Sequence, residues 1–344
     1  MQGNITKTTG VLLVNLGTPD STSTADVRKY LREFLSDPRV LDINPVVRTL
    51  LLNLVIAPFR SPKSAASYRE VWMEEGSPLM VYGRQVKQSL QESLGPDFHV
   101  QLAMRYQSPS IDSALENFRK EGIDHIRVIP MFPHYASAST GSVHEKIMDI
   151  VSKWQVIPQI SFLKSYHDEP GMIEAFAING ERHKPAEFDH IIFSFHGLPV
   201  RQLRKSDATG AYCQANGICC STFNETNKNC YAAQCHDTAR LLAARLEIDP
   251  GRYTISFQSR LGRDPWIRPS TQETILRLAA ESKKRVLIFC PAFVADCLET
   301  LFEVTTELKD EFVAAGGEHV ELVESLNNEP KWIETLVKLA KEVV

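Results

Sequence analysis

The sequence predicts an α/β protein made of two similar Rossmann-like domains, each with a parallel sheet flanked by helices. Three observations support this prediction. Strand-like apolar runs alternate with helical patterns along all 344 residues. The runs are almost continuously Val, Ile and Leu, as is typical of parallel strands that are buried on both faces. The two halves of the chain also repeat the same layout, and the length suits two domains of roughly 150 residues.

Eight runs are predicted to be strands, and helical patterns separate them. The strands are Gly10–Leu16, Val100–Met104, His125–Met131, Ile160–Leu163, His190–Phe195, Tyr253–Gln258, Arg285–Cys290 and Val320–Val323. The clearest helices are Ile111–Lys120, Thr238–Leu246, Thr271–Ser282 and Lys331–Val344. We place the domain boundary at 168/169, which gives domains 1–168 and 169–344. Since ligands of such sheets bind beyond the carboxyl ends of the strands, we expect the strand-end loops to converge on one active-site cleft between the domains.

The composition excludes several classes of protein. Lys and Arg number 38 against 42 Asp and Glu, and this net charge of −4 argues against nucleic-acid binding. Hydrophobic residues make up 43% and charged residues 23%, which excludes a disordered chain. The densest apolar stretch, Leu50–Phe59, is shorter than the ~20 residues that a spanning helix needs. We therefore expect a cytoplasmic protein without a signal peptide.

Two segments interrupt the strand–helix alternation. Residues 41–62 are apolar almost all round any helix drawn through them, and 46–59 carry a single charge, Arg48. Such a run is either a core helix or an exposed apolar lip of the kind that contacts a membrane or a ligand. Residues 206–236 form a predicted insertion that holds five of the seven cysteines. In a cytosolic chain this clustering favours metal binding over disulfides.

Candidate catalytic residues follow two of the strands. His196 comes directly after HIIFSF and precedes a glycine, which suits a proton acceptor, although a loop histidine bonded to the backbone fits equally well. Asp296, Glu299 and Glu303 follow the strand RVLIFC and share one face of the helix expected from Asp296. They are either solvated acids of a first helical turn or a carboxylate row that handles a divalent cation or protons.

Arginines beside aromatic residues occupy further loops. Arg105, Tyr106 and Trp266 follow strands, and Arg60 and Tyr68 flank the apolar segment. Guanidinium groups pair with carboxylates and aromatic rings stack, so the set suits a flat, anionic, aromatic ligand. Ordinary surface arginines and half-buried rings are the alternative.

Over nearly its whole length the chain resembles the ferrochelatases. The matching stretches, in order, are VNLGTPDS (14–21), FRSPKSAASY (59–68), GSPL (76–79), FPHYASASTGS (132–142), SFHGLP (194–199), GRDPWIRP (262–269), ADCLETLFE (295–303) and ESLN (324–327). The resemblance implies insertion of Fe²⁺ into a porphyrin, with loss of two pyrrole protons. It makes His196 and Glu299 the central residues for metal and protons, with Asp296 and Glu303 extending the acidic row. Where some relatives have a second histidine, this chain has Cys297.

The resemblance also implies a porphyrin pocket and a cofactor. The residues that would line the pocket are Arg60, Tyr68, Ser77, Arg105, Tyr106 and Trp266. Some ferrochelatases carry a [2Fe–2S] cluster, and the cysteine insertion is long enough to hold one. The expected ligands are Cys213, Cys220, Cys230 and Cys235, with Cys219 as an alternate because adjacent cysteines would have difficulty ligating together. Structural zinc, disulfides or free thiols remain alternatives.

The leading prediction is therefore a protoporphyrin ferrochelatase, a lyase that ends haem synthesis, with porphyrin, ferrous iron and a membrane surface as partners. The apolar segment 46–59 would rest on the inner membrane face. A coproporphyrin ferrochelatase and a cobalt or nickel chelatase are alternatives within the same class. A haem- or iron-sensing binding protein, with the cysteines as a redox switch, comes from another class. A sensor has no need of both His196 and the acidic row, so their joint presence favours an enzyme.

Overall fold

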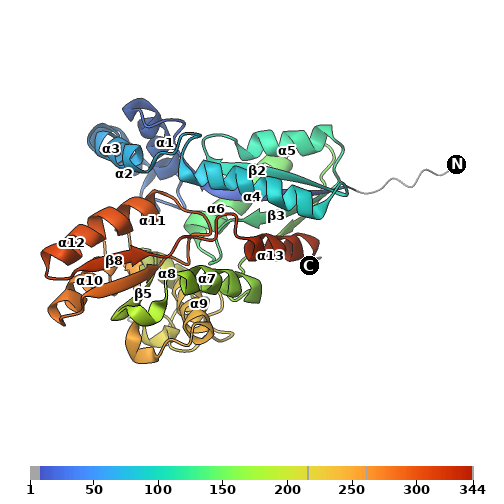
Figure 1. Cartoon of the computed structure of the whole chain (residues 1–344). Coiled ribbons are helices and arrows are strands. Elements are labelled where there is room, and N and C mark those ends of the chain that lie inside the picture. Colours follow the sequence, from blue (N-terminus) through green and yellow to red (C-terminus); the bar gives the residue numbers. More distant parts are fainter. Residues whose placement is uncertain (1–7, 215–216, 261, 263, 343–344) are drawn as a thin grey trace. The chain divides into compact units, whose positions relative to one another are not determined.

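The computed structural model describes residues 8–214, 217–260, 262 and 264–342 (Figure 1). The chain divides into two compact units. The first comprises Met1–Phe132, Ser137–Lys164 and Trp332–Val344, and the second comprises Pro133–Ala136 and Ser165–Lys331. The sequence-based boundary at 168/169 lies near the main crossing, but the C-terminal helix is counted with the first unit.

The first unit has a four-stranded parallel sheet in the order β2-β1-β3-β4. Its strands are β1 (Thr9–Gly17), β2 (Phe98–Tyr106), β3 (His125–Pro130) and β4 (Gln159–Phe162). Its helices are α1 (Thr24–Ser36), α2 (Pro45–Leu51), α3 (Ser61–Val71), α4 (Pro78–Leu94), α5 (Ile111–Lys120), α6 (Ser142–Val151) and α13 (Pro330–Lys341), with π-helical segments η1 (Leu52–Arg60) and η2 (Ser137–Gly141).

The second unit repeats the first, with a parallel sheet in the order β6-β5-β7-β8. Its strands are β5 (His190–His196), β6 (Tyr253–Gln258), β7 (Arg285–Phe289) and β8 (His319–Leu322). Its α-helices are α7 (Pro170–Arg182), α8 (Val200–Lys205), α9 (Tyr231–Arg245), α10 (Thr271–Ala280), α11 (Leu298–Phe302) and α12 (Lys309–Ala314). The remaining helical segments are the π-helical η6 (Glu303–Leu308) and the short η3 (Pro185–Glu187), η4 (Ile218–Cys220) and η5 (Pro250–Arg252).

The central strands of both sheets are buried on both faces, which is why they appear in the sequence as continuous apolar runs. In β1, Val11 to Val14 are wholly buried, and the interior residues of β5 are buried as well. The strand ends are equally constrained. A Cβ on Gly17, where φ is +129°, would lie 2.2 Å from the carbonyl oxygen of Tyr106, so only glycine fits where β1 ends beside β2.

All eight predicted strands are present and the predicted fold class is confirmed. One helix prediction needs correction. The helix expected from Thr238 already begins at Tyr231, so the last part of the predicted insertion is helical. The C-terminal helix packs on the first unit through the buried Trp332, and the buried Arg127 of β3 donates from Nε to the carbonyl oxygen of Leu339 at 3.1 Å. A buried guanidinium needs such an acceptor.

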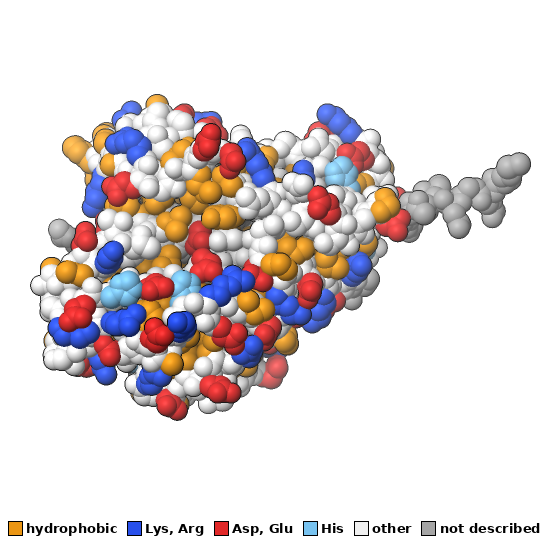
Figure 2. Space-filling model, in the orientation of Figure 1, with side chains coloured by type: hydrophobic (Ala, Val, Ile, Leu, Met, Phe, Trp, Pro, Cys, Tyr) orange, Lys and Arg blue, Asp and Glu red, His pale blue; other side chains and the backbone are white. Residues whose placement is uncertain are grey.

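The surface agrees with the modest net charge. On the face shown in Figure 2, acidic and basic side chains are interspersed rather than separated into fields of one sign. No helix in the described part of the chain is long and apolar enough to cross a membrane.

One surface histidine of the second unit is held by two carboxylates. His183 has Nδ1 2.5 Å from Oε1 of Glu321 and Nε2 2.6 Å from Oε2 of Glu324. A carboxylate accepts hydrogen bonds, so both ring nitrogens donate and the ring is an imidazolium. Burial alone would lower the pKa of His183, but the hydrogen bonds to the two glutamates outweigh it, and the pKa is raised above 6.5.

This pairing predicts a pH-dependent contribution to stability. A pKa that is higher in the folded state gives stabilisation that is complete below the unfolded pKa of about 6.5 and is lost as pH rises through the folded pKa. His183→Gln should therefore lower the melting temperature more at pH 6 than at pH 9, as followed by circular dichroism. The control is His236→Gln, because burial and Arg240 lower the pKa of His236 to about 4. Equal destabilisation by His183→Gln at both pH values would contradict the prediction.

Candidate active site

The first predicted catalytic residue lies at the end of β5. His196 is the last residue of this strand, and its Nδ1 lies 2.7 Å from the carbonyl oxygen of Gly197. A carbonyl cannot donate, so Nδ1 carries the proton and Nε2 has a free lone pair. The hydroxyl of Tyr231 donates to the backbone carbonyl of His196 at 2.8 Å and fixes the strand end.

The loop after His196 has room only for glycine. A Cβ on Gly197 would lie 2.9 Å from the carbonyl oxygen of Gln258 and 3.2 Å from the ring of Trp266. The backbone nitrogen of Gly197 donates to that same carbonyl at 2.7 Å. The ring of Trp266 therefore lies against Gly197, the residue after His196, and its role in porphyrin binding stays a prediction.

Two of the three predicted acids, Glu299 and Glu303, lie on one helical segment that changes from α-helical to π-helical geometry between them. Glu299 lies on α11, and Glu303 opens the π-helical η6. The amide of Gln258 donates from Nε2 to the backbone carbonyl of Glu299 at 2.8 Å, and Ser259 Oγ donates to Oε2 of Glu303 at 2.5 Å. The end of β6 thus holds both glutamates. π-Helical segments are rare and frequently found at functional sites.

Burial and charge tune these groups toward neutral pH. Burial raises the pKa of Glu303 to about 7, helped by the negative charges of Glu299 and Glu307. Burial also lowers the pKa of His196 below 6.5, although the charge of Glu299 acts in the opposite direction. At pH 7 the site therefore holds a neutral imidazole and a carboxylate that is close to half protonated. Both are suited to proton transfer.

Asp296 lies in a different environment from the one its spacing predicted. The helix begins at Leu298 rather than near Asp296, and the side chain of Asp296 is buried. Its carboxylate accepts hydrogen bonds from the amide of Asn327 at 2.7 Å, the hydroxyl of Thr300 at 3.0 Å and the backbone nitrogen of Ser325 at 3.2 Å. The structure thus gives Asp296 a part in holding the 323–327 loop, and its catalytic role stays a prediction.

The acidic row instead continues to Glu307, which the sequence analysis did not include. Glu307 lies four residues after Glu303 on η6, is exposed, and contributes to the raised pKa of Glu303. The i, i+4 spacing of Glu299, Glu303 and Glu307 was the signal that could have found it.

In the first unit, the predicted Arg105–Tyr106 pair belongs to a buried network around Asp37. Arg105 Nη2 lies 2.7 Å from Oδ2 of Asp37, and the Tyr106 hydroxyl donates to the same oxygen at 2.9 Å. Ser142 Oγ donates to it at 2.5 Å and accepts from Nε of Arg105 at 2.6 Å. Burial opposes ionisation of Asp37, but hydrogen bonds from Ser142, the Arg39 backbone and Tyr106, together with the charge of Arg105, lower its pKa. Asp37 and Ser142 were missed because they lie far from Arg105 in the sequence.

The other predicted pocket residues of the first unit take different positions. Arg60 is exposed at the end of η1, whereas Tyr68 is buried and meets the ring of Trp72 edge to face at 6.1 Å between centroids. Ser77 is buried as the N-cap of α4 and accepts from the backbone nitrogen of Met80. A role in porphyrin binding stays a prediction for each of these residues.

Four of the five clustered cysteines surround one small cavity of the second unit. Cys213, Cys219, Cys220 and Cys230 line it, and the sulfurs of Cys219 and Cys220 are 3.9 Å apart. The hydrogen bond from Cys220 lowers the pKa of Cys230 to about 6, with help from backbone N–H groups at the start of α9. Cys235 is wholly buried on α9 and is not among the residues that line the cavity.

The fold is similar to that of a solved structure with two such units. The structure of SirB from Bacillus subtilis with Fe³⁺ matches 97% of this chain and 95% of its own, with a TM-score of 0.52. The sequence identity is 12%, so this likeness concerns the fold alone.

Sequence comparisons define the family. A family model described as Ferrochelatase matches residues 8–344. A ferrochelatase of Opitutus terrae is 43% identical over 95% of this chain and 95% of its own length. Ferrochelatases of Pseudomonas fluorescens Pf0-1 (42%; 96% of this chain and 97% of theirs) and Coxiella burnetii CbuK_Q154 (40%; 97% and 93%) are similar over comparable lengths. The chain belongs to the ferrochelatase family, and is an enzyme that inserts iron into a porphyrin.

The raised pKa of Glu303 predicts the pH dependence of this reaction. Glu303 can accept a proton only when ionised, so the rate of Fe²⁺ insertion should rise with pH around a midpoint near 7. Glu303→Gln should remove this rise and lower the rate at pH 8 by roughly 10²-fold, the size expected of a general base. Initial rates of haem formation, measured without oxygen at pH values from 5.5 to 8.5, show both the rise with pH and the loss of rate in Glu303→Gln.

Glu307→Gln is the matched variant for this experiment. It removes a like charge near Glu303, so the midpoint should move to lower pH while the rate at pH 8 is retained. A midpoint near 7 that persists in Glu303→Gln would show that another group is responsible.

Proposed function

We propose that the porphyrin substrate is protoporphyrin IX and that His196 receives the pyrrole protons as Fe²⁺ enters. The observation that carries this proposal is the free Nε2 lone pair of His196 beside a carboxylate row that contains a group of pKa about 7. A porphyrin must lose two N–H protons for each metal ion that enters, and this site has acceptors for both.

The proposed reaction starts from a distorted ring. A flat porphyrin keeps its N–H bonds in the ring plane, and tilting the pyrroles exposes nitrogen lone pairs to the metal. The Nε2 atom of neutral His196 accepts a pyrrole proton, and Glu299 favours the resulting imidazolium through its charge. Glu303 carries protons from the buried site toward solvent.

The charges of the first unit favour a porphyrin with few carboxylates. Arg105 is already paired with Asp37, and Arg39 makes two hydrogen bonds to Glu145 at 2.7 and 3.1 Å. These guanidinium groups therefore carry less uncompensated charge for the propionates of a substrate. Protoporphyrin has fewer such groups than coproporphyrin, so it needs fewer free cations.

The test compares the two porphyrins directly. Purified protein, Fe²⁺ and either protoporphyrin IX or coproporphyrin III are mixed without oxygen, and the haem spectrum is followed. We expect kcat/KM for protoporphyrin to exceed that for coproporphyrin at least tenfold. A preference for coproporphyrin would move the chain to the alternative substrate, and binding of haem without turnover of either porphyrin would support the sensor alternative.

In the same assay, His196→Ala should reduce kcat for protoporphyrin by roughly 10²-fold or more, because it removes the proton acceptor. Porphyrin affinity, measured by fluorescence quenching, should change little. Glu299→Gln should be nearly as damaging. The control is His190→Gln, on the same strand but bonded to Thr254 at 2.9 Å. Retention of more than about a tenth of the wild-type rate in His196→Ala would exclude the assignment.

We also propose that the apolar segment of the first unit rests on the inner membrane face. Six large apolar side chains of α2 and η1 are more than half exposed, and they are Val46, Val47, Leu50, Leu54, Val55 and Phe59. Only Leu52, Ile56 and Ala57 of η1 are buried, so the outer face lies outside the core of its unit. The adjoining α1 presents Arg28, Lys29 and Arg32 along one open groove that Glu33 also lines, and this excess of basic groups suits anionic headgroups.

The exposed side chains of this apolar segment predict weak, reversible membrane binding. Each large aliphatic moved from water into lipid is worth roughly 1.5–3 kcal/mol, so a few residues are enough for attachment without a spanning helix. Leu54→Ser, Val55→Ser and Phe59→Ser together should reduce sedimentation with anionic liposomes at least fivefold and raise the KM for protoporphyrin. Val156→Ser with Ile157→Ser is the control, because these side chains are 74% and 62% exposed on another loop. A large loss of melting temperature, or equal binding by both variants, would contradict the proposal.

A third part of the proposal is that the cysteine cavity holds a [2Fe–2S] cluster. Four thiols line one cavity, and the hydrogen bond between two of them lowers the pKa of Cys230 and raises that of Cys220, so one of the four is readily available as a metal-binding thiolate. The 3.9 Å between the sulfurs of Cys219 and Cys220 is close to the ~3.7 Å edge of a tetrahedral site with 2.3 Å metal–sulfur bonds, so the two can serve together. The proposed ligands are Cys213, Cys219, Cys220 and Cys230. A bound cluster would supply redox chemistry and a cross-link for the loop.

Cysteine variants test this ligand set. Anaerobically purified protein should be red-brown and contain about two irons per chain. Cys219→Ser should bleach it, whereas Cys235→Ser and Cys290→Ser should keep the colour because both thiols are buried elsewhere. If Cys235→Ser bleached the protein and Cys219→Ser did not, the ligands would be the set expected from the sequence, with Cys235 in place of Cys219. Stoichiometric zinc without iron would indicate a structural zinc site.

A further inference from the structure

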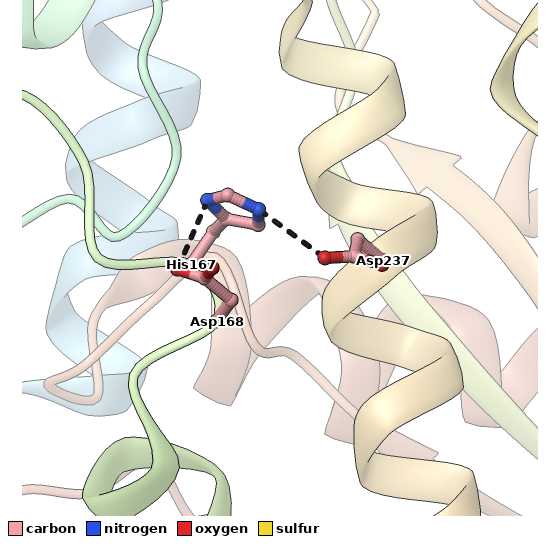
Figure 3. A group of neighbouring side chains, drawn as sticks. All are labelled: His167, Asp168 and Asp237. Atoms are coloured by element: carbon pink, nitrogen blue, oxygen red, sulfur yellow. Dashed lines mark ion pairs between the residues drawn. The ribbon is translucent and has the colours of Figure 1, made fainter. Parts of the chain in front are cut away.

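A buried histidine of the second unit lies between two aspartates (Figure 3). His167 and Asp168 precede α7, and Asp237 projects from α9. One ring nitrogen of His167 and one carboxylate oxygen from each aspartate lie within 4.8 Å of one another. This is the only such three-residue group of potential metal ligands within the described ranges of the chain. It lies outside both the acidic row and the cysteine cavity.

The distances in this group are longer than those of normal hydrogen bonds. His167 is 4% exposed, and neither of its ring nitrogens has a hydrogen-bond partner. Nε2 is 3.4 Å from Oδ2 of Asp237, and Nδ1 is 3.7 Å from Oδ1 of Asp168. Nitrogen–oxygen hydrogen bonds are normally 2.7–3.2 Å. Two donors bound at about 2.1 Å to one tetrahedral metal ion are about 3.4 Å apart, so the Nε2–Oδ2 separation suits a bridging cation.

The surrounding residues hold the three side chains in place. The hydroxyl of Thr238 donates to the backbone carbonyl of His167 at 2.6 Å. Because its proton is used there, Thr238 accepts from Nε2 of His134 at 2.9 Å, which ties a second buried histidine to the group. Arg240 donates to Oδ1 of Asp237 at 2.8 Å and leaves Oδ2 facing His167.

The protonation state and access also suit a metal. Burial lowers the pKa of His167 below 6.5, although the two aspartates oppose this, so the ring is neutral at pH 7 and keeps a lone pair. The ring of Phe223 covers His167 at 4.9 Å between centroids. The side chain of Asp168 is 59% exposed, which gives an ion a route from solvent and leaves room for water ligands.

We propose that His167, Asp168 and Asp237 bind an exchangeable divalent transition-metal ion. One imidazole nitrogen and two carboxylate oxygens are donors that Mn²⁺, Fe²⁺, Co²⁺ and Zn²⁺ all accept. Bound there, the ion joins the segment before α7 to α9. The site does not depend on the proposed substrate or on the cluster.

The experiment uses Mn²⁺ alone, because this hard ion avoids the thiolates of the cysteine cavity. Free Mn²⁺ is counted by electron paramagnetic resonance while it is titrated into the full-length protein. The double variant Asp168→Asn/Asp237→Asn should lose one bound Mn²⁺, or bind it at least tenfold more weakly. Asp310→Asn, which removes an exposed carboxylate from α12, should bind as the wild type does. Glu303→Gln should leave this ion in place, which separates it from any ion at the acidic row.

Two further readouts locate the ion and guard against misfolding. Pulsed resonance spectra of bound Mn²⁺ should show coupling to an imidazole nitrogen in the wild type and in Glu303→Gln, and none from this site in the double variant. Crystals soaked in MnCl₂ should give an anomalous peak between His167 and Asp237. Unchanged Mn²⁺ binding in a folded double variant, or a peak only elsewhere, would overturn the proposal and leave His167 as an imidazole in contact with two carboxylates.

Discussion

The arrangement of the candidate catalytic residues depends on one buried side-chain amide, that of Gln258 at the end of β6. Its oxygen accepts from Ser194 Oγ at 2.6 Å on β5 and from the thiol of Cys290 at 3.5 Å just after β7. Its nitrogen donates to the backbone carbonyl of Glu299. A single planar group therefore joins three adjacent strand ends to the first turn of α11. An unsatisfied buried amide is costly, so the strands and the helix hold one another in register.

The sheet order gives this amide its position. β5 lies between β6 and β7, and His196 is in register with Gln258. In a parallel sheet the carboxyl ends of neighbouring strands meet at one edge, so His196, Gln258 and the segment after Cys290 converge without long loops. The first unit has the same order, and its strand end at Tyr106 is likewise tied down by a buried hub, the carboxylate of Asp37. The two units thus use different chemistry, a neutral amide and an ion-paired carboxylate, at equivalent strand ends.

The features that could be predicted from the sequence are those set by contiguous residues, such as strands and the residues that follow them. Contacts between side chains far apart in the chain could not be predicted. The fold class, the eight strands and the position of His196 followed from local patterns, because apolar runs and the residues after them are contiguous in the chain. Asp296 was placed in the acidic row by helical spacing and by the family resemblance, and the sequence did not show that Asn327 and Ser325 bind its carboxylate from 31 and 29 residues away. The replacement of Cys235 by Cys219 in the proposed cluster site depends on where α9 begins. The sequence predicted a helix only from Thr238, because the preceding segment is rich in polar residues and shows no helical apolar pattern, whereas α9 begins at Tyr231.

Burial in the second unit brings the pKa values of Glu303 and His196 into a range where both side chains are able to accept protons near pH 7. Burial disfavours charge, so it lowers the pKa of a histidine and raises that of a glutamate. In solution the two side chains differ by about two pKa units. At this site burial raises the pKa of Glu303 to about 7 and lowers that of His196, and the charge of Glu299 resists the second shift while reinforcing the first. With these shifts a neutral imidazole and a carboxylate that is close to half protonated are present together at pH 7, so each can take up a proton there. The exposed Glu307 lies four residues after Glu303, and its negative charge adds to the raised pKa of Glu303.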